Sequence, residues 1–199
     1  MVIDVVHDMQ AVFRKLLHSM SRPGEVSTLK STIAHTDRWS CHEATYLTIL
    51  TLFDAEVSFH IVSNKQKKNL EKQIAEYTLA RNAPIDEADF VIVLQGTKEQ
   101  TILEAMGTCK IGNLLDPQHA ATWIVENERI VQEGNLILSG PGIQQQTTIQ
   151  LDISDSIIQA RNERIKEFPL GIDMILTDAK SQVLCIPRTT TIVLKGGTQ

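Results

Sequence analysis

Two arginines beside prolines are the residues whose type and position best suit contact with an anion. Arg22 precedes Pro23, and Arg188 follows Pro187. A guanidinium can donate two parallel hydrogen bonds to phosphate-type oxygens. Because proline tends to end a helix or strand, we expect both arginines in loops, where binding sites are usually built. The alternatives are that each arginine pairs with a carboxylate or packs against a partner subunit.

Asp173 is a third candidate, two residues after Gly171. Its carboxylate could orient an arginine, cap a loop or act as a general base. A general base must reach a proton of the bound substrate within hydrogen-bond distance, which a sequence does not show. We therefore assign no catalytic residue and keep Asp173 with the two arginines as anion or interface contacts.

Glycines beside these residues predict tight turns that are either structural or face a ligand. The segment Gly140-Pro141-Gly142 could present backbone N–H groups to an anion, although Pro141 supplies none. Gly24 and Gly171 mark comparable turns.

Several well-known site patterns are absent or incomplete. Gly107 and Gly112 have the spacing of a phosphate-binding loop, but the lysine and hydroxyl that should follow are missing. Cys41 and His42 have no second pair to complete a metal site, and Cys109 and Cys185 are isolated in the sequence. We expect no metal, no cofactor, no iron–sulfur cluster and no disulfide framework.

Composition and charge narrow the class of protein. The chain has 199 residues, 42% of them hydrophobic, and a net charge of -5, which argues against broad binding to nucleic acid. Its first residues do not resemble a secretory signal, and no stretch approaches the roughly 20 apolar residues of a membrane span. We expect one cytoplasmic domain over residues 1–199 with no membrane partner.

Hydrophobic periodicity predicts five helices. The first covers residues 8–20 and the third surrounds Leu70 and Tyr77. The second should begin at Ser40, and the fourth at Thr97 with Gly107 after its end, because each start has capping-box spacing. The fifth should cover residues 155–167.

Apolar runs and alternation predict the strands. The run 89–94 is almost continuously apolar, which indicates a strand buried on both faces. The other predicted strands are 59–62, 123–125, 136–138, 148–153, 172–176, 183–186 and 191–194. Helices and strands mix along the chain, so we predict an α/β fold with a mixed sheet covered by helices.

Taken together, four motifs resemble one known family. They are MSRPG (residues 20–24), LSGPGI (138–143), FPLGID (168–173) and IPRTT (186–190), with LFDAE (52–56) and EADF (87–90) between them in the same order. This series is similar to PhnH, a subunit of bacterial carbon–phosphorus lyase, over about residues 7–192.

The resemblance implies more than spacing can show. It implies a three-layer αβα sandwich resembling the fold of pyridoxal-phosphate-dependent transferases without the cofactor, and a homodimer when isolated. It implies other carbon–phosphorus lyase core subunits as partners. Their shared reaction transfers an alkylphosphonate onto the ribose C1 of ATP and releases adenine, in a step of phosphonate catabolism for which this chain is needed but is inactive alone.

The alternative is a stand-alone small-ligand binder or transferase-like enzyme that uses the cleft of the fold. A pyridoxal-phosphate enzyme would need a lysine that forms a Schiff base. By residue type alone, the possible ones are Lys110, Lys166, Lys180 and Lys195.

Overall fold

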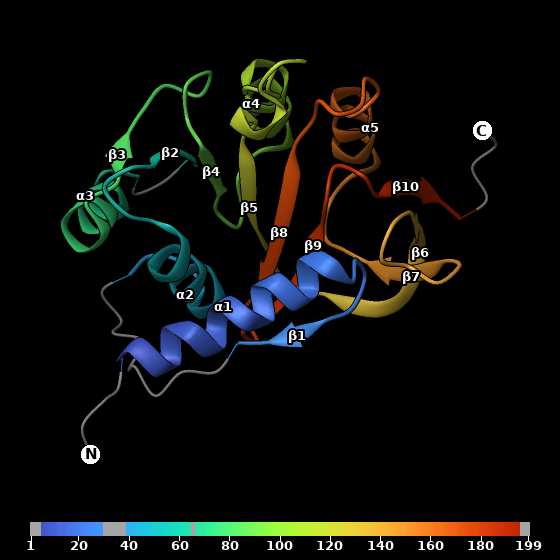
Figure 1. Cartoon of the computed structure of the whole chain (residues 1–199), viewed down its shortest axis with the longest axis horizontal. Helices are drawn as coiled ribbons and strands as arrows, with labels where there is room; N and C mark the ends of the chain where they lie inside the picture. Colours follow the sequence, from blue (N-terminus) through green and yellow to red (C-terminus); the bar gives the residue numbers. More distant parts are fainter. Residues whose placement is uncertain (1–4, 30–38, 65–66, 196–199) are drawn as a thin grey trace.

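A computed structural model describes residues 5–29, 39–64 and 67–195 (Figure 1). The helices of this part are α1 (Val5–Ser21), α2 (Glu43–Leu52), α3 (Lys67–Thr78), α4 (Glu99–Thr108) and α5 (Asp155–Arg164), with a short 3-10 helix η1 (Pro117–His119). The strands are β1 (Ser27–Thr28), β2 (Ser58–Val62), β3 (Arg81–Asn82), β4 (Phe90–Val93), β5 (Thr122–Asn127), β6 (Val131–Ser139), β7 (Thr147–Gln150), β8 (Asp173–Asp178), β9 (Gln182–Ile186) and β10 (Thr191–Leu194). None of these helices is both long and apolar enough to cross a membrane.

A seven-stranded mixed sheet forms the centre of the protein. Its strand order is β1-β9-β8-β5-β4-β2-β3. The five strands β3, β2, β4, β5 and β8 are parallel, whereas β9 runs antiparallel to β8 and β1 antiparallel to β9. The mixed α/β sheet confirms the predicted fold class. A second, three-stranded antiparallel sheet of order β10-β6-β7 was not predicted as a separate unit.

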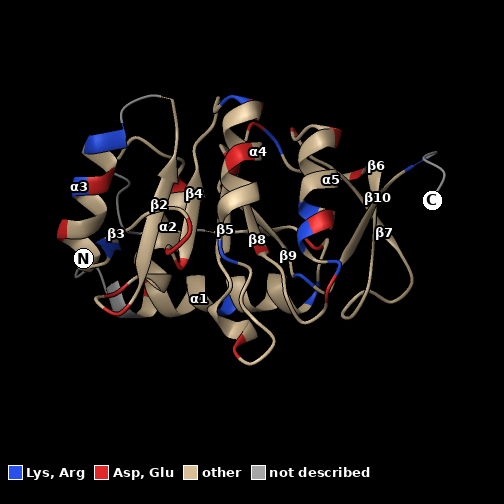
Figure 2. Cartoon of the chain, turned by 90° about the horizontal axis from the view of Figure 1, so that it is seen from above, with Lys and Arg blue, Asp and Glu red and all other residues tan. Residues whose placement is uncertain are grey.

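Apolar side chains cover both faces of the large sheet. Along β4, Val91 and Val93 belong to the core cluster shared with α4, α5 and the small sheet, while Ile92 belongs to the cluster shared with α1, α2 and α3. Figure 2 shows α4 and α5 on one side of the strands and α1 on the other. The continuous apolar run predicted burial on both faces, and this prediction is confirmed because successive strand residues point to opposite faces.

The two helix starts predicted from capping-box spacing are both displaced, whereas α5 begins at Asp155 as expected. Helix α2 begins at Glu43 with His42 as the N-cap, three residues after the expected start at Ser40. Helix α4 begins at Glu99 with Lys98 as the N-cap. The Thr97 hydroxyl instead donates to the backbone oxygens of residues 62 and 94, so it joins the ends of β2 and β4. In both cases a tertiary contact replaced the local cap.

Three predicted ends were also wrong. Gly107 lies inside α4, which continues to Thr108. Helix α5 ends at Arg164, where the backbone N–H groups of Ile165 and Lys166 bond to carbonyl oxygens three residues back, at Asn162 and Glu163. Strand β7 covers Thr147–Gln150 rather than residues 148–153, since its pairing with β6 ends at Gln150.

Candidate functional site

The four sequence motifs lie together, and we call them the motif cluster: residues 20–24, 138–143, 168–173 and 186–190. Gly142 adopts φ +84 beside the first motif, where an added Cβ would overlap the backbone oxygen of Ser21 and lie 2.9 Å from Pro23. Gly140 adopts φ +140, and a Cβ there would lie 2.7 Å from the backbone oxygen of Thr189. A residue with a Cβ atom does not fit at either of these two close contacts, so both positions require glycine.

Arg188 is held by the motif cluster itself. Its Nη2 lies 2.5 Å from Asp173 Oδ2, and its Nε donates to both carboxylate oxygens of Asp173. Its Nη1 donates to the backbone oxygens of Pro117 and Pro169. The side chains of the pair are only 15% and 22% exposed. The structure thus brings two of the predicted site residues together, and Asp173 orients the arginine.

Gly171 belongs to the same junction. Its N–H donates to the backbone oxygen of Ile111, and a Cβ at this position would lie 3.3 Å from Arg188 Cβ. The arginine therefore joins the loops around residues 111–119 and 168–171.

Arg22 is not brought into that junction. Its Nη1 lies 3.8 Å from Glu25 Oε1, and the arginine side chain is 58% exposed. Gly24, two residues on, packs so closely that an added Cβ would overlap the Thr147 methyl group. Arg22 is therefore the predicted anion contact whose guanidinium stays open to solvent.

Sequence reasoning missed a buried arginine beneath the cluster. Arg161 of α5 is fully buried and donates from Nη1 and Nη2 to the backbone oxygens of Thr190 and Pro187, each at 2.6 Å. Burial lowers the pKa of Arg161 to about 10, although the nearby Asp173 carboxylate opposes that shift. Its position in the short sequence Gln-Ala-Arg-Asn gave no sign of burial, because the helix has no marked apolar face.

The parallel strands create a different candidate site at their carboxyl ends. The chain crosses from β2 to β3 through α3, and from β4 to β5 through α4, in opposite directions along the sheet. Ligands of open α/β sheets usually bind where the direction reverses. A groove of about 440 Å³ lies there, which we call the switch-point groove, and its lining includes Trp39, His42, Ser63, Gln95 and Glu126.

One carboxylate organises this groove. Glu126, at the end of β5, accepts the backbone N–H of His42 at 2.5 Å and that of Gln95 at 3.0 Å. His42 Nε2 also lies 2.9 Å from Gln95 Oε1, so the histidine is hydrogen-bonded and not part of a metal site in the described residues. The negative charge at the N-terminus of α2 favours the helix start at Glu43. Polar residues directly after two predicted strands, Gln95 and Glu126, were the signal that sequence reasoning overlooked.

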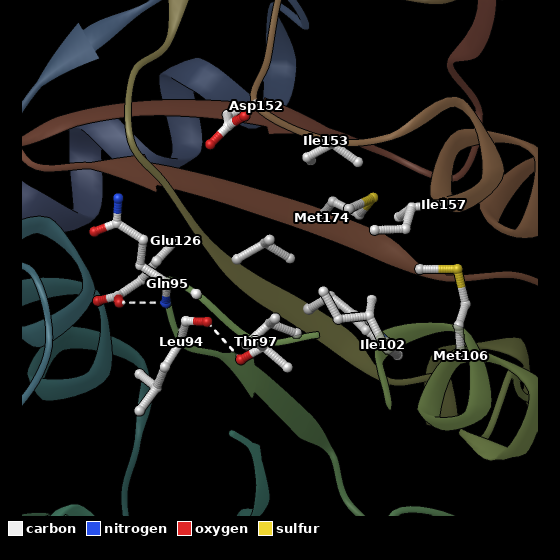
Figure 3. Close-up of a pocket in the computed structure, with 14 residues that line it drawn as sticks. Leu94, Gln95, Thr97, Ile102, Met106, Glu126, Asp152, Ile153, Ile157 and Met174 are labelled. Carbon is white, nitrogen blue, oxygen red and sulfur yellow. Dashed lines mark hydrogen bonds between the residues drawn. The ribbon is translucent and has the colours of Figure 1, made fainter. Parts of the chain in front are cut away.

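A smaller and more enclosed cavity adjoins the groove, and we call it the β4–β5 pocket. Its volume is about 170 Å³. Figure 3 shows Met106, Met174 and Ile157 at one end and Gln95 and Glu126 at the other. The two cavities share Leu94, Gln95 and Glu126.

The electrostatics of both cavities oppose anion binding. Among the described residues, neither lining contains Lys or Arg, and Glu126 borders both. Burial, together with the charge of Glu126, raises the pKa of the Cys41 thiol well above its ordinary value. Cys41 is therefore a poor nucleophile, because the thiolate is the reactive form.

The lysines weighed for a Schiff base lie elsewhere. Lys110 forms an ion pair with Asp89 at 2.5 Å, and Lys166 with Glu163 at 2.6 Å. Lys180 borders a separate groove, and Lys195 is exposed after β10.

Comparison with known proteins identifies the family of this chain. Residues 2–193 match the family model of PhnH, described as a bacterial phosphonate metabolism protein. The chain belongs to the PhnH family. It is 31% identical over 192 residues to HtxG of Stutzerimonas stutzeri, a protein provisionally named as a C-P lyase subunit, covering 94% of this chain and 87% of that protein.

A second relative has a more specific name. The chain is 31% identical over 191 residues to a Rhizobium meliloti protein, covering 94% of this chain and 91% of the relative. That relative is named alpha-D-ribose 1-methylphosphonate 5-triphosphate synthase subunit PhnH. The four motifs of the motif cluster all lie within the matched residues of the family model.

Proposed function

We propose that this chain acts as a subunit of a carbon–phosphorus lyase assembly in phosphonate catabolism. It acts in the step that transfers an alkylphosphonate onto the ribose C1 of ATP with release of adenine. The observation that carries the proposal is the match to the PhnH family over residues 2–193, together with two relatives that are both named as subunits of such systems.

The site geometry supports a role inside an assembly. The described cavities at the carboxyl ends of the strands contain no Lys or Arg to hold a triphosphate or a phosphonate. Asp173 and the backbone oxygens of Pro117 and Pro169 already occupy the Arg188 guanidinium. We therefore propose that other subunits supply most of the charged groups that a phosphoryl substrate needs.

An exposed apolar surface adjoins the motif cluster. Arg188 holds the loops around residues 111–119 and 168–171 side by side, and Leu114, Leu115 and Phe168 on these loops are exposed. Large apolar side chains in solvent are typical of surfaces that bind another protein. We propose that this surface and Arg22 face another lyase subunit, with Arg188 and Asp173 positioning the loops.

The finer structural expectations belong to the same proposal. The parallel strands with helices on both faces support the expected likeness to pyridoxal-phosphate-dependent transferases, in a chain that works without the cofactor. The chain is a single domain that forms a homodimer when isolated and works in the cytoplasm. Light scattering of the purified chain tests the dimer, which should have twice the chain mass of 22.2 kDa.

Deletion of the gene in the native host tests the proposed function. The deletion strain should grow on inorganic phosphate but not on methylphosphonate as the sole phosphorus source, and the wild-type gene should restore growth. Added ribose 1-methylphosphonate 5-triphosphate in a cell extract should bypass the defect, because it is the product of the missing step. Growth of the deletion strain on methylphosphonate would contradict the proposal.

A second function is a small-ligand binder that works alone. The enclosed β4–β5 pocket is the observation that favours it, because most ligand sites are concave and largely apolar with a few polar groups.

A further inference from the structure

The β4–β5 pocket is built by side chains that the motif cluster does not use. It lies where β4 and β5 end, and its lining includes residues of α4, α5 and β8. The pocket lining contains no residue of the motif cluster (20–24, 138–143, 168–173 and 186–190). Asp173, the first residue of β8, belongs to the cluster and does not line the pocket. The pocket is thus a separate feature of the described chain.

Its inner end suits a flat apolar group. Met106, Met174, Ile102 and Ile157 form this end in Figure 3, and the fully buried Trp123 also borders the pocket. Methionine side chains adapt to the shape of a ligand, and their sulfur atoms make favourable contacts with aromatic rings. A volume of about 170 Å³ admits one aromatic ring with a small substituent.

The opposite end of the pocket is negatively charged. Glu126 is almost fully buried, with its side chain 3% exposed, and its oxygens accept the N–H groups of His42 and Gln95. Asp152 borders the same end, is exposed, and forms no ion pair or hydrogen bond with any other described residue. The Gln95 side chain adds an amide beside the two carboxylates.

Positive charge is missing from this lining. Among the described residues that border the pocket there is no Lys, Arg or His. Arg129 and Lys180 border a neighbouring groove that also touches Asp152, but neither lies within 4.0 Å of its carboxylate oxygens. In a partly enclosed site of low polarity, an uncompensated carboxylate attracts a cation and repels an anion.

We propose that the β4–β5 pocket binds a small aromatic amine or amidine. The ring lies against the methionines, and the protonated nitrogen points to Asp152 and the Gln95 amide oxygen. Glu126 strengthens the negative potential while it holds the two backbone N–H groups. The inference does not depend on the subunit role, because it concerns the isolated chain.

Methionine methyl signals provide a direct test. The chain labelled with ¹³C at the methionine methyl groups is titrated with benzamidine, and with phenylphosphonate as an anion with the same ring. Met106 and Met174 signals, assigned with Met106→Leu and Met174→Leu variants, should shift and saturate with benzamidine. Met9 and Met20 on α1 lie outside the pocket and should not move. Phenylphosphonate should shift neither pocket signal.

Variants then separate the charge from the cavity. Asp152→Asn should weaken benzamidine binding about fivefold, as expected for loss of one exposed charged partner. Asp86→Asn removes the same charge from an exposed site outside the pocket and should leave the affinity unchanged. Ile153→Phe should fill the pocket and abolish the shifts.

The result that would overturn the proposal is equally clear. Benzamidine that shifts no pocket methionine at millimolar concentration, or phenylphosphonate that shifts them equally, excludes a site for aromatic cations. An unchanged affinity in Asp152→Asn with unaltered Met9 and Met20 signals also excludes it. None of these outcomes bears on whether the chain joins a carbon–phosphorus lyase assembly.

Discussion

Arg188 and Asp173 form a largely buried ion pair that joins the last two sequence motifs. The arginine donates to both carboxylate oxygens, and the Arg188 backbone N–H also donates to Asp173 Oδ1 at 2.7 Å. Because Arg188 continues to the carbonyls of Pro117 and Pro169, this single pair fixes the separation of two surface loops. The pair explains why an arginine suited to anion contact has a structural position.

Arg188→Ala should destabilise the chain substantially. The change leaves Asp173 partly buried without its partner, so we expect the free energy of unfolding to fall by about 2–3 kcal/mol. Urea denaturation measures this loss. Lys166→Ala breaks an exposed ion pair with Glu163 and should cost less than about 1 kcal/mol. Equal losses in the two variants would contradict a structural role for Arg188.

Arg22→Ala should impair growth without loss of stability. The side chain is exposed and has only a long contact with Glu25, so the free energy of unfolding should change by less than about 0.5 kcal/mol. Growth on methylphosphonate should fail if Arg22 meets a partner or an anion. Arg14→Ala, on the exposed surface of the same helix, is the control and should grow normally. Normal growth of the Arg22 variant removes it from any essential role.

Glu126→Gln should loosen the ends of β4 and α2. A neutral amide accepts the backbone N–H groups of His42 and Gln95 less strongly, and its own NH₂ group opposes one of them. We expect a loss of about 2 kcal/mol and faster hydrogen exchange at the two amides. Hydrogen-exchange NMR checks both sites. Unchanged exchange at residues 42 and 95 would show that the carboxylate does not hold them.

Two glycine substitutions should have opposite signs. Gly142→Ala places a Cβ against Ser21 and Pro23 at φ +84, so we expect a loss above about 2 kcal/mol. Gly107→Ala adds a Cβ inside α4 with no atom within 4 Å, and should stabilise the chain by about 0.5–1 kcal/mol. Thermal unfolding of both variants measures the difference. A stable Gly142→Ala variant would argue against close packing of the first two motifs.

Asp89 should add an acid-sensitive part to the stability. Burial raises its pKa, but hydrogen bonds from Lys110 and Ser58 outweigh that effect and lower the pKa below its ordinary value. A depressed folded-state pKa means that the stabilisation is full above the unfolded pKa of about 4 and is lost as the pH falls through the folded value. The stability difference between wild type and Asp89→Asn should therefore shrink below about pH 4. A difference that stays constant down to about pH 2 would contradict this assignment.

The core elements were predictable because their patterns are local. The alternation of Val91, Ile92 and Val93 between two core clusters follows from a continuous apolar run. The glycines of the four motifs also predicted tight turns. Their spatial order was not predictable, because contacts such as Gly140 with Thr189 join segments about 50 residues apart in sequence.

Tertiary contacts account for what the sequence concealed. The start of α2 moved to Glu43 because a carboxylate from β5 reaches the His42 N–H, which a capping-box pattern cannot reveal. Arg161 reads as a surface residue, since its burial depends on carbonyl groups of the distant loop at residues 187–190. The β4–β5 pocket needs three strands and two helices to assemble, so no single segment indicates it.

Affinity purification from the native host tests the central claim most directly. The tagged chain is isolated from cells grown on methylphosphonate as sole phosphorus source, and the mass and composition of the assembly are measured. The account predicts stoichiometric recovery with other carbon–phosphorus lyase subunits in an assembly much larger than the chain's own 22.2 kDa. Recovery of the chain alone, as a monomer or as its homodimer, would contradict it.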